Sequence, residues 1–220
     1  MRIHLKISST DEIIPFNHQE KMVGTINKWI GTNNAEHGAV SLFSFSRLEG
    51  GKALKGKGLK YENGASFFIS AHNDEIIKSI VWGIQQDNTL FGGMSVAEMA
   101  LEQNPDLSNR ERFYVASPIF IKRFTETHTE HIVYTDERAS QYLKETLQTK
   151  MKMVGIIDDD FEIYFNTTDR GAGTKLINYK GIGNRANWCS VTIKGSAETK
   201  LFAWNVGLGN STGIGFGAIR

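Results

Sequence analysis

The sequence of 220 residues predicts an α+β protein built from two ferredoxin-like (RRM-like) units in tandem, with a glycine-rich loop near its C-terminus. Strand-like alternation and helical stripes of apolar residues follow one another in the order βαββαβ. The same order then recurs in the second half, as a repeat of topology without residue identity. Five of the 22 glycines crowd into Gly207–Gly217, between a predicted helix and a predicted final strand.

The first half begins with residues 2–8, where apolar and polar side chains alternate with the period of a strand that has one wet face. A helical pattern occupies residues 17–31, with Asn17 as the expected N-cap and Gly31 as the stop. The other predicted elements of this half are two strands, a helix and an extended segment, at 39–48, 65–71, 76–84 and 89–101.

The second half opens with a strand at residues 113–124 that Pro118 interrupts, followed by a helical stripe over residues 137–152. Three strands and a second helix are predicted before the glycine loop, at 161–165, 174–180, 188–194 and 197–206. A polar segment, NPDLSNRER, ends at Arg112. It predicts a boundary between an N-terminal domain, 1–112, and a C-terminal domain, 113–220.

Composition argues against a disordered or a membrane-spanning chain. Hydrophobic residues make up 40% and prolines number three, and no apolar run approaches the ~18 residues that a membrane span needs. The N-terminus alternates, unlike the apolar block of a signal peptide. The single Cys189 cannot form an intramolecular disulfide. We therefore expect a protein of the reducing cytoplasm.

The net charge is only +1, but the charges are unevenly distributed. The segment GGKALKGKGLKY, residues 50–61, holds four lysines and no acidic residue, and we expect it to form a mobile cationic loop. Residues 170–200 hold six basic residues and one acidic residue. Two such segments in a nearly neutral chain predict a polyanion bound on one face. The proposed phosphate contacts are Lys52, Lys55, Lys57, Lys180 and Arg185.

The glycine cluster predicts close approach of another group to the backbone. Glycine lacks a Cβ and reaches positive φ without penalty, so consecutive N–H groups could meet a phosphate backbone. A dinucleotide fingerprint would open a helix after a strand, and a P-loop would need a following Lys and Ser or Thr. Neither pattern is present in VGLGNSTGIGFGAI.

Four segments together resemble a known family: IPFNHQEKMVGTINKWI, NNAEHGAVSLFSFS, ERFYVASPIFIK and GLGNSTGIGFG. They are similar to the CRISPR-associated endoribonuclease that trims repeat transcripts, the sixth Cas protein family of the RAMP superfamily. The resemblance covers essentially the whole chain. It implies two ferredoxin-like domains and metal-independent cleavage of pre-crRNA without a cofactor. In that reaction a 2′-hydroxyl attacks the adjacent phosphorus, giving 2′,3′-cyclic phosphate and 5′-hydroxyl ends.

His37 matches the family's catalytic histidine, and a pKa of about 6.5 suits either proton role. His18 is its nearest rival, but at the first helical turn it is expected to order the helix start. Where relatives carry a tyrosine and a lysine, this chain has Asn27 and Ser41. The resemblance therefore implies that cleavage rests on His37, with help from Lys28, Arg47 or a lysine of the 52–60 loop. Ser41 completes the predicted catalytic set as a candidate hydrogen-bond donor to a phosphate oxygen.

The resemblance names repeat RNA as the partner and implies no metal site; His128 and His131 lack a third ligand nearby in the sequence. The full set of predicted RNA contacts is Asn27, Arg47, Lys52, Lys55, Lys57, Lys180, Arg185, Gly207, Gly209, Gly215 and Gly217. A catalytically weak or inactive RNA-binding subunit of a CRISPR effector complex is the main alternative, because the usual Tyr and Lys are replaced. A nucleotide-binding enzyme is a second. Association with Cas effector subunits and formation of a homodimer both stay open.

Overall fold

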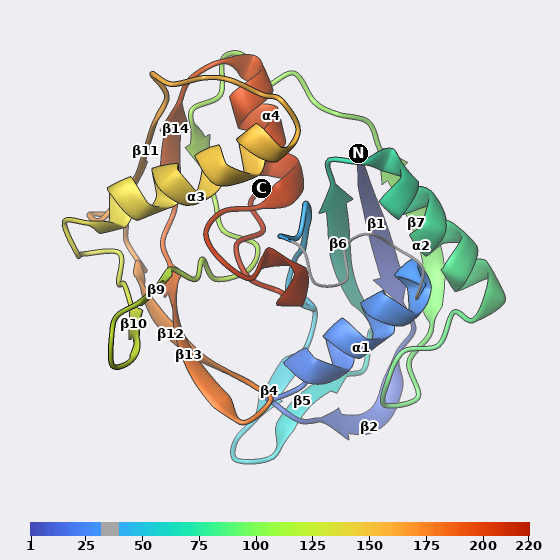
Figure 1. Cartoon of the computed structure of the whole chain (residues 1–220). Coiled ribbons are helices and arrows are strands. Elements are labelled where there is room, and N and C mark those ends of the chain that lie inside the picture. The colour runs from blue at the N-terminus through green and yellow to red at the C-terminus, as the bar shows by residue number, and fades with distance from the viewer. Residues whose placement is uncertain (32–39) are drawn as a thin grey trace.

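The computed structural model describes residues 1–31 and 40–220. Its first half forms a four-stranded antiparallel sheet in the order β3-β6-β1-β7. These strands are β1 (Arg2–Ile7), β3 (Phe43–Phe45), β6 (Ala65–Ala71) and β7 (Val96–Glu102). The helices α1 (Gln19–Ile30) and α2 (Asp74–Gln86) lie over one face of this sheet (Figure 1). This is the predicted βαββαβ order, with the sheet order of a ferredoxin-like fold.

The second half repeats this arrangement in a reduced form. Its three-stranded sheet has the order β11-β14-β8 and packs with two helices (Figure 1). The elements are β8 (Arg112–Phe113), α3 (Ala139–Met153), β11 (Glu162–Phe165), β14 (Val191–Lys194) and α4 (Ala197–Val206). The prediction of one continuous strand over 188–194 was wrong in its extent. This range contains the last residue of β13 (Ile182–Trp188) and then a separate strand, β14.

The predicted final strand is absent as a regular element from the described residues. After α4 the chain forms a 3₁₀ turn, η1 (Thr212–Ile214), and then an isolated bridge between Ile219 and Val115. Gly215 and Gly217 have φ angles of 92° and 74°, which are incompatible with a pleated strand. The terminal segment nevertheless occupies the edge position of a fourth strand, because Tyr114 and Arg220 exchange two backbone hydrogen bonds of 2.8 Å.

The cationic segment 50–61 is a β-hairpin, so the prediction of a mobile loop was wrong. Its strands, β4 (Lys52–Leu54) and β5 (Gly58–Tyr61), pair with each other, and β5 also pairs with β2 (Thr10–Ile14), an element that the sequence pattern did not reveal. Two further hairpins project from the second half. They are β9 (Lys122–Phe124) with β10 (Thr129–His131), and β12 (Gly173–Tyr179) with β13.

The start of α1 differs from the prediction that Asn17 caps it. His18 occupies the N-cap position, without a side-chain cap hydrogen bond. Its imidazole is buried, lies 2.9 Å from the carbonyl of Pro15 through Nδ1, and stacks on Phe91. Burial lowers the pKa of His18 more than the bond to Pro15 raises it. The side chain therefore orders the entry into α1, as expected for this histidine.

Buried side chains form two large clusters, one within residues 3–96 and one within residues 107–219. Arg2 joins them. Its buried guanidinium lies 3.8 Å from the ring centroids of both Phe68 and Trp204. It donates hydrogen bonds of 3.1 and 2.9 Å to the carbonyls of Trp204 and Ile219. A residue of the first strand thus holds α4 and the terminal segment against the first sheet.

None of the helices within the described ranges combines the length and hydropathy that crossing a membrane requires.

Candidate functional site

The glycine loop, residues 207–217, is mostly buried within the protein. A Cβ on Gly209 would strike the carbonyl of Phe120, and a Cβ on Gly217 would strike the carbonyl of Leu208. Both residues also have φ angles of 74°, which only glycine adopts without strain. The prediction of close approach is therefore confirmed, but the group that approaches is the protein's own backbone.

The loop also touches the first half of the chain. A Cβ on Gly207 would lie 2.8 Å from the Ser44 Cβ, and one on Gly213 would strike the Ser41 hydroxyl. A Cβ on Gly215 would strike the Gln19 side chain, which donates a hydrogen bond to the carbonyl of Ile214. The glycines therefore allow α1, the β3 segment and the loop to pack together. Direct RNA contact by Gly207, Gly209, Gly215 and Gly217 stays a prediction.

Several backbone N–H groups of the loop donate within the protein. Leu208 and Gly217 donate to Gly217 and Pro118 respectively, both at 2.9 Å, and Asn210 donates to Phe120 at 2.7 Å. These bonds fix the loop before any ligand arrives. A preformed loop loses little conformational entropy on binding.

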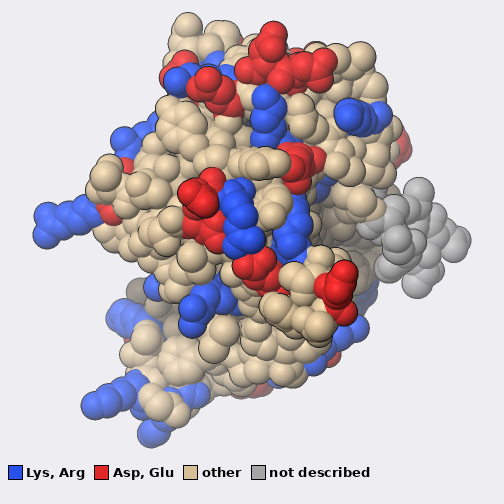
Figure 2. All heavy atoms as spheres, turned by 60° about the vertical axis from the view of Figure 1, so that its left-hand side comes forward, with Lys and Arg blue, Asp and Glu red and all other residues tan. Residues whose placement is uncertain are grey.

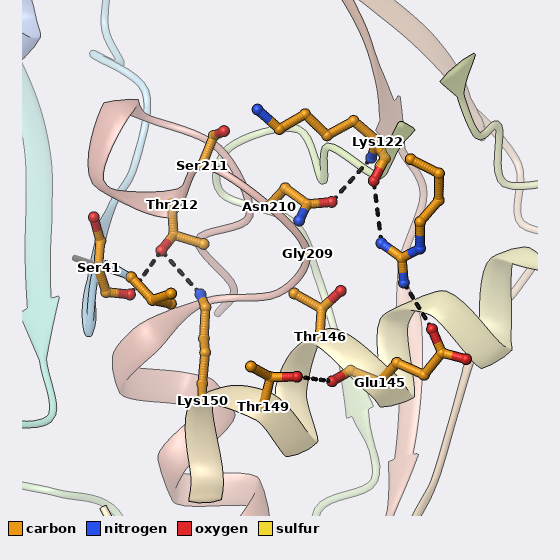
Figure 3. A pocket seen from close by; sticks show the side chains of 12 residues that line it. Ser41, Lys122, Glu145, Thr146, Thr149, Lys150, Gly209, Asn210, Ser211 and Thr212 are labelled. Carbon is orange, nitrogen blue, oxygen red and sulfur yellow. Dashed lines mark hydrogen bonds and ion pairs between the residues drawn. The ribbon is translucent and has the colours of Figure 1, made fainter. Parts of the chain in front are cut away.

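One cavity, of about 450 Å³, opens beside this loop (Figure 3). Three parts of the chain form its walls: the residues just before β3, the α3 helix with β9, and the glycine loop. Its lining residues are Val40, Ser41, Lys122, Arg123, Glu145, Thr146, Thr149, Lys150, Gly209, Asn210, Ser211 and Thr212. Nine of these twelve residues carry a hydroxyl, amide or cationic group, and Glu145 adds one carboxylate. Such a lining suits a polar anionic ligand more than an apolar one.

A chain of hydrogen bonds crosses the floor of the cavity and connects the two halves. The ammonium of Lys150 is buried and donates to the Thr212 hydroxyl at 3.0 Å and to the carbonyl of Val206 at 3.4 Å. The Thr212 hydroxyl in turn donates to the carbonyl of Ser41 at 3.4 Å. Figure 3 shows the Lys150 ammonium and the Ser41 carbonyl both directed at the Thr212 hydroxyl. The carbonyl of Val206 belongs to the last turn of α4, where a helix favours positive charge.

Lys122 and Arg123 bring two further cations to the other wall. Arg123 is occupied: it pairs with Glu145 at 3.0 Å and stacks 4.0 Å above the Tyr142 ring. No hydrogen bond or ion pair to a described residue engages the Lys122 ammonium. The Lys122 N–H donates to the Asn210 side chain at 2.9 Å, which fixes β9 against the loop. Ser211 beside them has a φ of 62°, an uncommon value for serine that marks a tightly constrained position.

The predicted catalytic residues are only partly brought together. Ser41 lines the cavity. His37 lies outside the described residues, three positions before Val40 in the sequence. Lys28 lies on the α2 side of α1, where its ammonium contacts Asp87 and Thr89, each at 2.8 Å. It is not among the residues that line the cavity, so its catalytic role stays a prediction.

The remaining predicted RNA contacts are dispersed over the surface. Asn27 is exposed on α1, and Arg47, half-buried, follows β3 and donates its N–H to Ala116. Lys52, Lys55 and Lys57 are exposed on the β4–β5 hairpin. Lys52 contacts Glu62 at 3.5 Å.

Lys180 and Arg185 are exposed on the β12–β13 hairpin, whose Tyr179 packs against the first core cluster. Figure 2 shows Lys and Arg side chains projecting from the lower end of the molecule, the end toward which both hairpins extend in Figure 1. Burial and the charges of Arg185 and Lys122 lower the pKa of His131 on the neighbouring β10 strand. These observations are in accord with a cationic surface, while the individual RNA contacts stay predictions.

Sequence reasoning missed Lys122, Lys150, Asn210 and Thr212 as lining residues of the cavity. Lys150 gave a signal: it lies beside the apolar stripe of its helix, next to Met151, in a position that should be buried. The other three give no local signal. Within the described ranges, no group of three or more His, Cys, Asp or Glu side chains is arranged to hold a metal ion.

Comparison with known proteins assigns the family. The model described as "CRISPR associated protein Cas6, C-terminal" matches residues 102–220, more than half of the chain. An endoribonuclease-like Cas6 protein of Pyrococcus furiosus is 25% identical over 241 residues, spanning 100% of this chain and 98% of the relative. CRISPR-associated endoribonuclease Cas6 1 of Methanocaldococcus jannaschii is 24% identical over 237 residues, spanning 100% of this chain and 92% of the relative.

Solved structures show the same fold. The product of a Cas6-related gene from Pyrococcus furiosus superposes with a TM-score of 0.86 at 24% identity, covering 100% of this chain and 97% of that one. A protein described as a RAMP protein binding different RNA substrates has a TM-score of 0.85 at 22% identity, covering 100% and 98%. With the family model matched over the second half and the fold matched over its full length, the chain belongs to the Cas6 family of CRISPR-associated proteins.

Proposed function

We propose that this protein is an endoribonuclease that cleaves CRISPR repeat RNA without a metal ion. The 2′-hydroxyl next to the scissile phosphate attacks phosphorus while the bond to the 5′-oxygen breaks. The products carry a 2′,3′-cyclic phosphate and a 5′-hydroxyl, so protons and electrons balance without a cofactor. This proposal transfers to the chain the endoribonuclease activity named for its relatives from Pyrococcus furiosus and Methanocaldococcus jannaschii.

The cavity is the observation that carries the proposal. Val40 and Ser41, which follow His37 in the sequence, form one of its walls, and the glycine loop forms another. His37 is assigned the proton transfer, as acid or base. Lys122, Asn210 and Ser211 supply the donors for the phosphate oxygens, because preorganised donors stabilise the extra negative charge that these oxygens carry in the transition state.

The two separate core clusters support a proposal in which the two predicted domains have different roles in the reaction. We assign the catalytic histidine to the N-terminal domain, 1–112, and the glycine loop with Lys122 and Lys150 to the C-terminal domain, 113–220. Repeat RNA would then lie across both domains. The lysines of the β4–β5 hairpin and the basic residues of the β12–β13 hairpin would contact its phosphates farther from the cut.

Substitution of His37 tests the proposal. The protein with His37→Ala should cleave repeat RNA about 10²–10⁴-fold more slowly while binding it nearly as the unchanged protein does. His4→Ala is the matched control, because His4 is exposed on β1 and does not line the cavity. Cleavage is followed on gels, with EDTA present and with a 2′-deoxy substitution at the cut site. Full activity of the His37 variant, or loss of activity in EDTA, contradicts the proposal.

An RNA-binding subunit without cleavage activity is the second candidate. The position of Lys28 favours it, because the cation named as a helper contacts Asp87 and Thr89 instead of lining the cavity. The same assay distinguishes the two functions. Tight binding of repeat RNA with no new ends after long incubation would establish the binding-only function.

A further inference from the structure

The β9–β10 hairpin carries an exposed aromatic ring beside the cavity. Phe124 is 76% exposed, so the fold gains little from burying it. A single exposed apolar side chain is ordinary on a protein surface. The surroundings of this one are not ordinary, because Lys122 lies two residues earlier on the same strand.

Lys122 and Phe124 share one face of β9, since side chains alternate along a strand. The Lys122 ammonium lies 5.3 Å from the centroid of the Phe124 ring, and Lys122 also lines the cavity. The ring therefore continues the wall of the cavity outward. An aromatic surface therefore lies next to the Lys122 ammonium, which forms no ion pair with a described residue.

The neighbouring strand β10 links this face to a further basic residue, Arg185, through His131. His131 is the partner of Lys122 in the pairing of β9 with β10, and it accepts a hydrogen bond of 3.3 Å from the Arg185 backbone. This contact brings the exposed Arg185 of β13 next to β10. Two nearby carboxylates are engaged, since Glu130 pairs with Arg138 at 2.7 Å and Glu145 pairs with Arg123. Glu126 is exposed in the turn that joins β9 to β10.

We propose that Phe124 is a stacking platform for an unpaired base of the bound RNA, and that Lys122 holds the phosphate next to that base at the mouth of the cavity. The inference rests on the proposed function, because it takes RNA as the ligand. An aromatic face beside cations is the arrangement by which proteins hold single-stranded nucleic acid, with the base on the ring and the phosphate on the cation. The charges favour a polyanion over an apolar protein partner.

Affinity measurements with Phe124 variants test the inference. The ligand is repeat RNA with a 2′-deoxy substitution at the cut site, so that binding is measured without cleavage. Phe124→Ala should weaken binding about 5- to 150-fold, from the loss of one stacked base, and Phe124→Trp should restore it. Trp82→Ala is the matched control: Trp82 is 65% exposed on α2, does not line the cavity, and its removal should leave affinity unchanged.

Photocrosslinking supplies a second measurement. Repeat RNAs that carry 5-iodouridine at successive positions should give, at one position, a crosslink that maps to Phe124. Crosslinks that map only elsewhere would overturn the inference. A Phe124→Ala protein that binds RNA as tightly as the unchanged protein would also overturn the inference. If that variant differs from the unchanged protein only in its sedimentation, Phe124 contacts another protein molecule and not RNA. If the unchanged protein binds no repeat RNA at all, both the inference and the proposed function are overturned.

Discussion

Replacing Gly217 by alanine should destabilise the protein even when no RNA is present. The residue has a φ of 74°, and a Cβ there would strike the backbone carbonyl of Leu208. Gly171 provides the matched control. Its φ is 90°, but a Cβ there would meet nothing within 4 Å. Comparing the two substitutions separates the cost of the backbone conformation from the cost of the collision.

The expected magnitudes follow from these two terms. Alanine in the left-handed region costs about 1–2 kcal/mol, so Gly171→Ala should lower the free energy of unfolding by about that amount. At Gly217 the collision with a buried backbone adds about 1–3 kcal/mol of overpacking. The total of about 2–5 kcal/mol is a large part of the ~5–15 kcal/mol by which a domain is normally stable.

Urea denaturation of each purified variant, followed by circular dichroism in the absence of RNA, measures both effects. If Gly217→Ala unfolds at the same urea concentration as the unchanged protein and loses only RNA affinity, the close partner of the loop is RNA and the reasoning from self-packing is refuted. Equal losses for Gly217→Ala and Gly171→Ala would refute the collision term alone.

Two further predictions concern stability. Arg2→Met should lower the free energy of unfolding by about 2–4 kcal/mol, because it removes two ring contacts and the hydrogen bonds to the carbonyls of Trp204 and Ile219. The Trp204 carbonyl would keep only the Ser70 hydroxyl, at 3.4 Å. An unchanged urea midpoint would contradict this. Acidification should destabilise the protein below about pH 6.5, the unfolded pKa of histidine, because burial lowers the pKa of His18 in the folded state. The unfolded chain then binds more protons, and the contribution of His18 is lost as the pH falls through the lowered pKa. Melting temperatures measured from pH 8 to pH 5 should fall less steeply for His18→Gln, and identical slopes would exclude His18 as a source.

Most regular elements could be predicted from the sequence because their signals are local. The alternation of Ile3, Leu5 and Ile7 fixes which face of β1 is buried, and the stripes of α1 and α2 do the same for the helices. The β4–β5 hairpin was misread because its lysines and glycines are typical of loops. Its strands depend on pairing with β2, a partner about 45 residues away that no local pattern announces.

The candidate site was harder to predict because contacts over long sequence separations create it. A glycine cluster indicates that something comes close, but cannot say what. At Gly209 the close group is Phe120, nearly 90 residues earlier. Lys150 could be read as buried from its helix, whereas its hydrogen bond to Thr212 depends on the packing of the loop. Resemblance to relatives supplied His37 and Ser41, and only Ser41 lies within the described residues.

The hydrogen-bonded chain from Lys150 through Thr212 to Ser41 has a consequence for heat inactivation. Its members lie on three segments that meet only when both halves are folded and docked. A partly unfolded molecule that has lost either half has also lost a wall of the cavity. The proposed cleavage activity should therefore be lost on heating no later than the melting of either half, with no active fragment surviving.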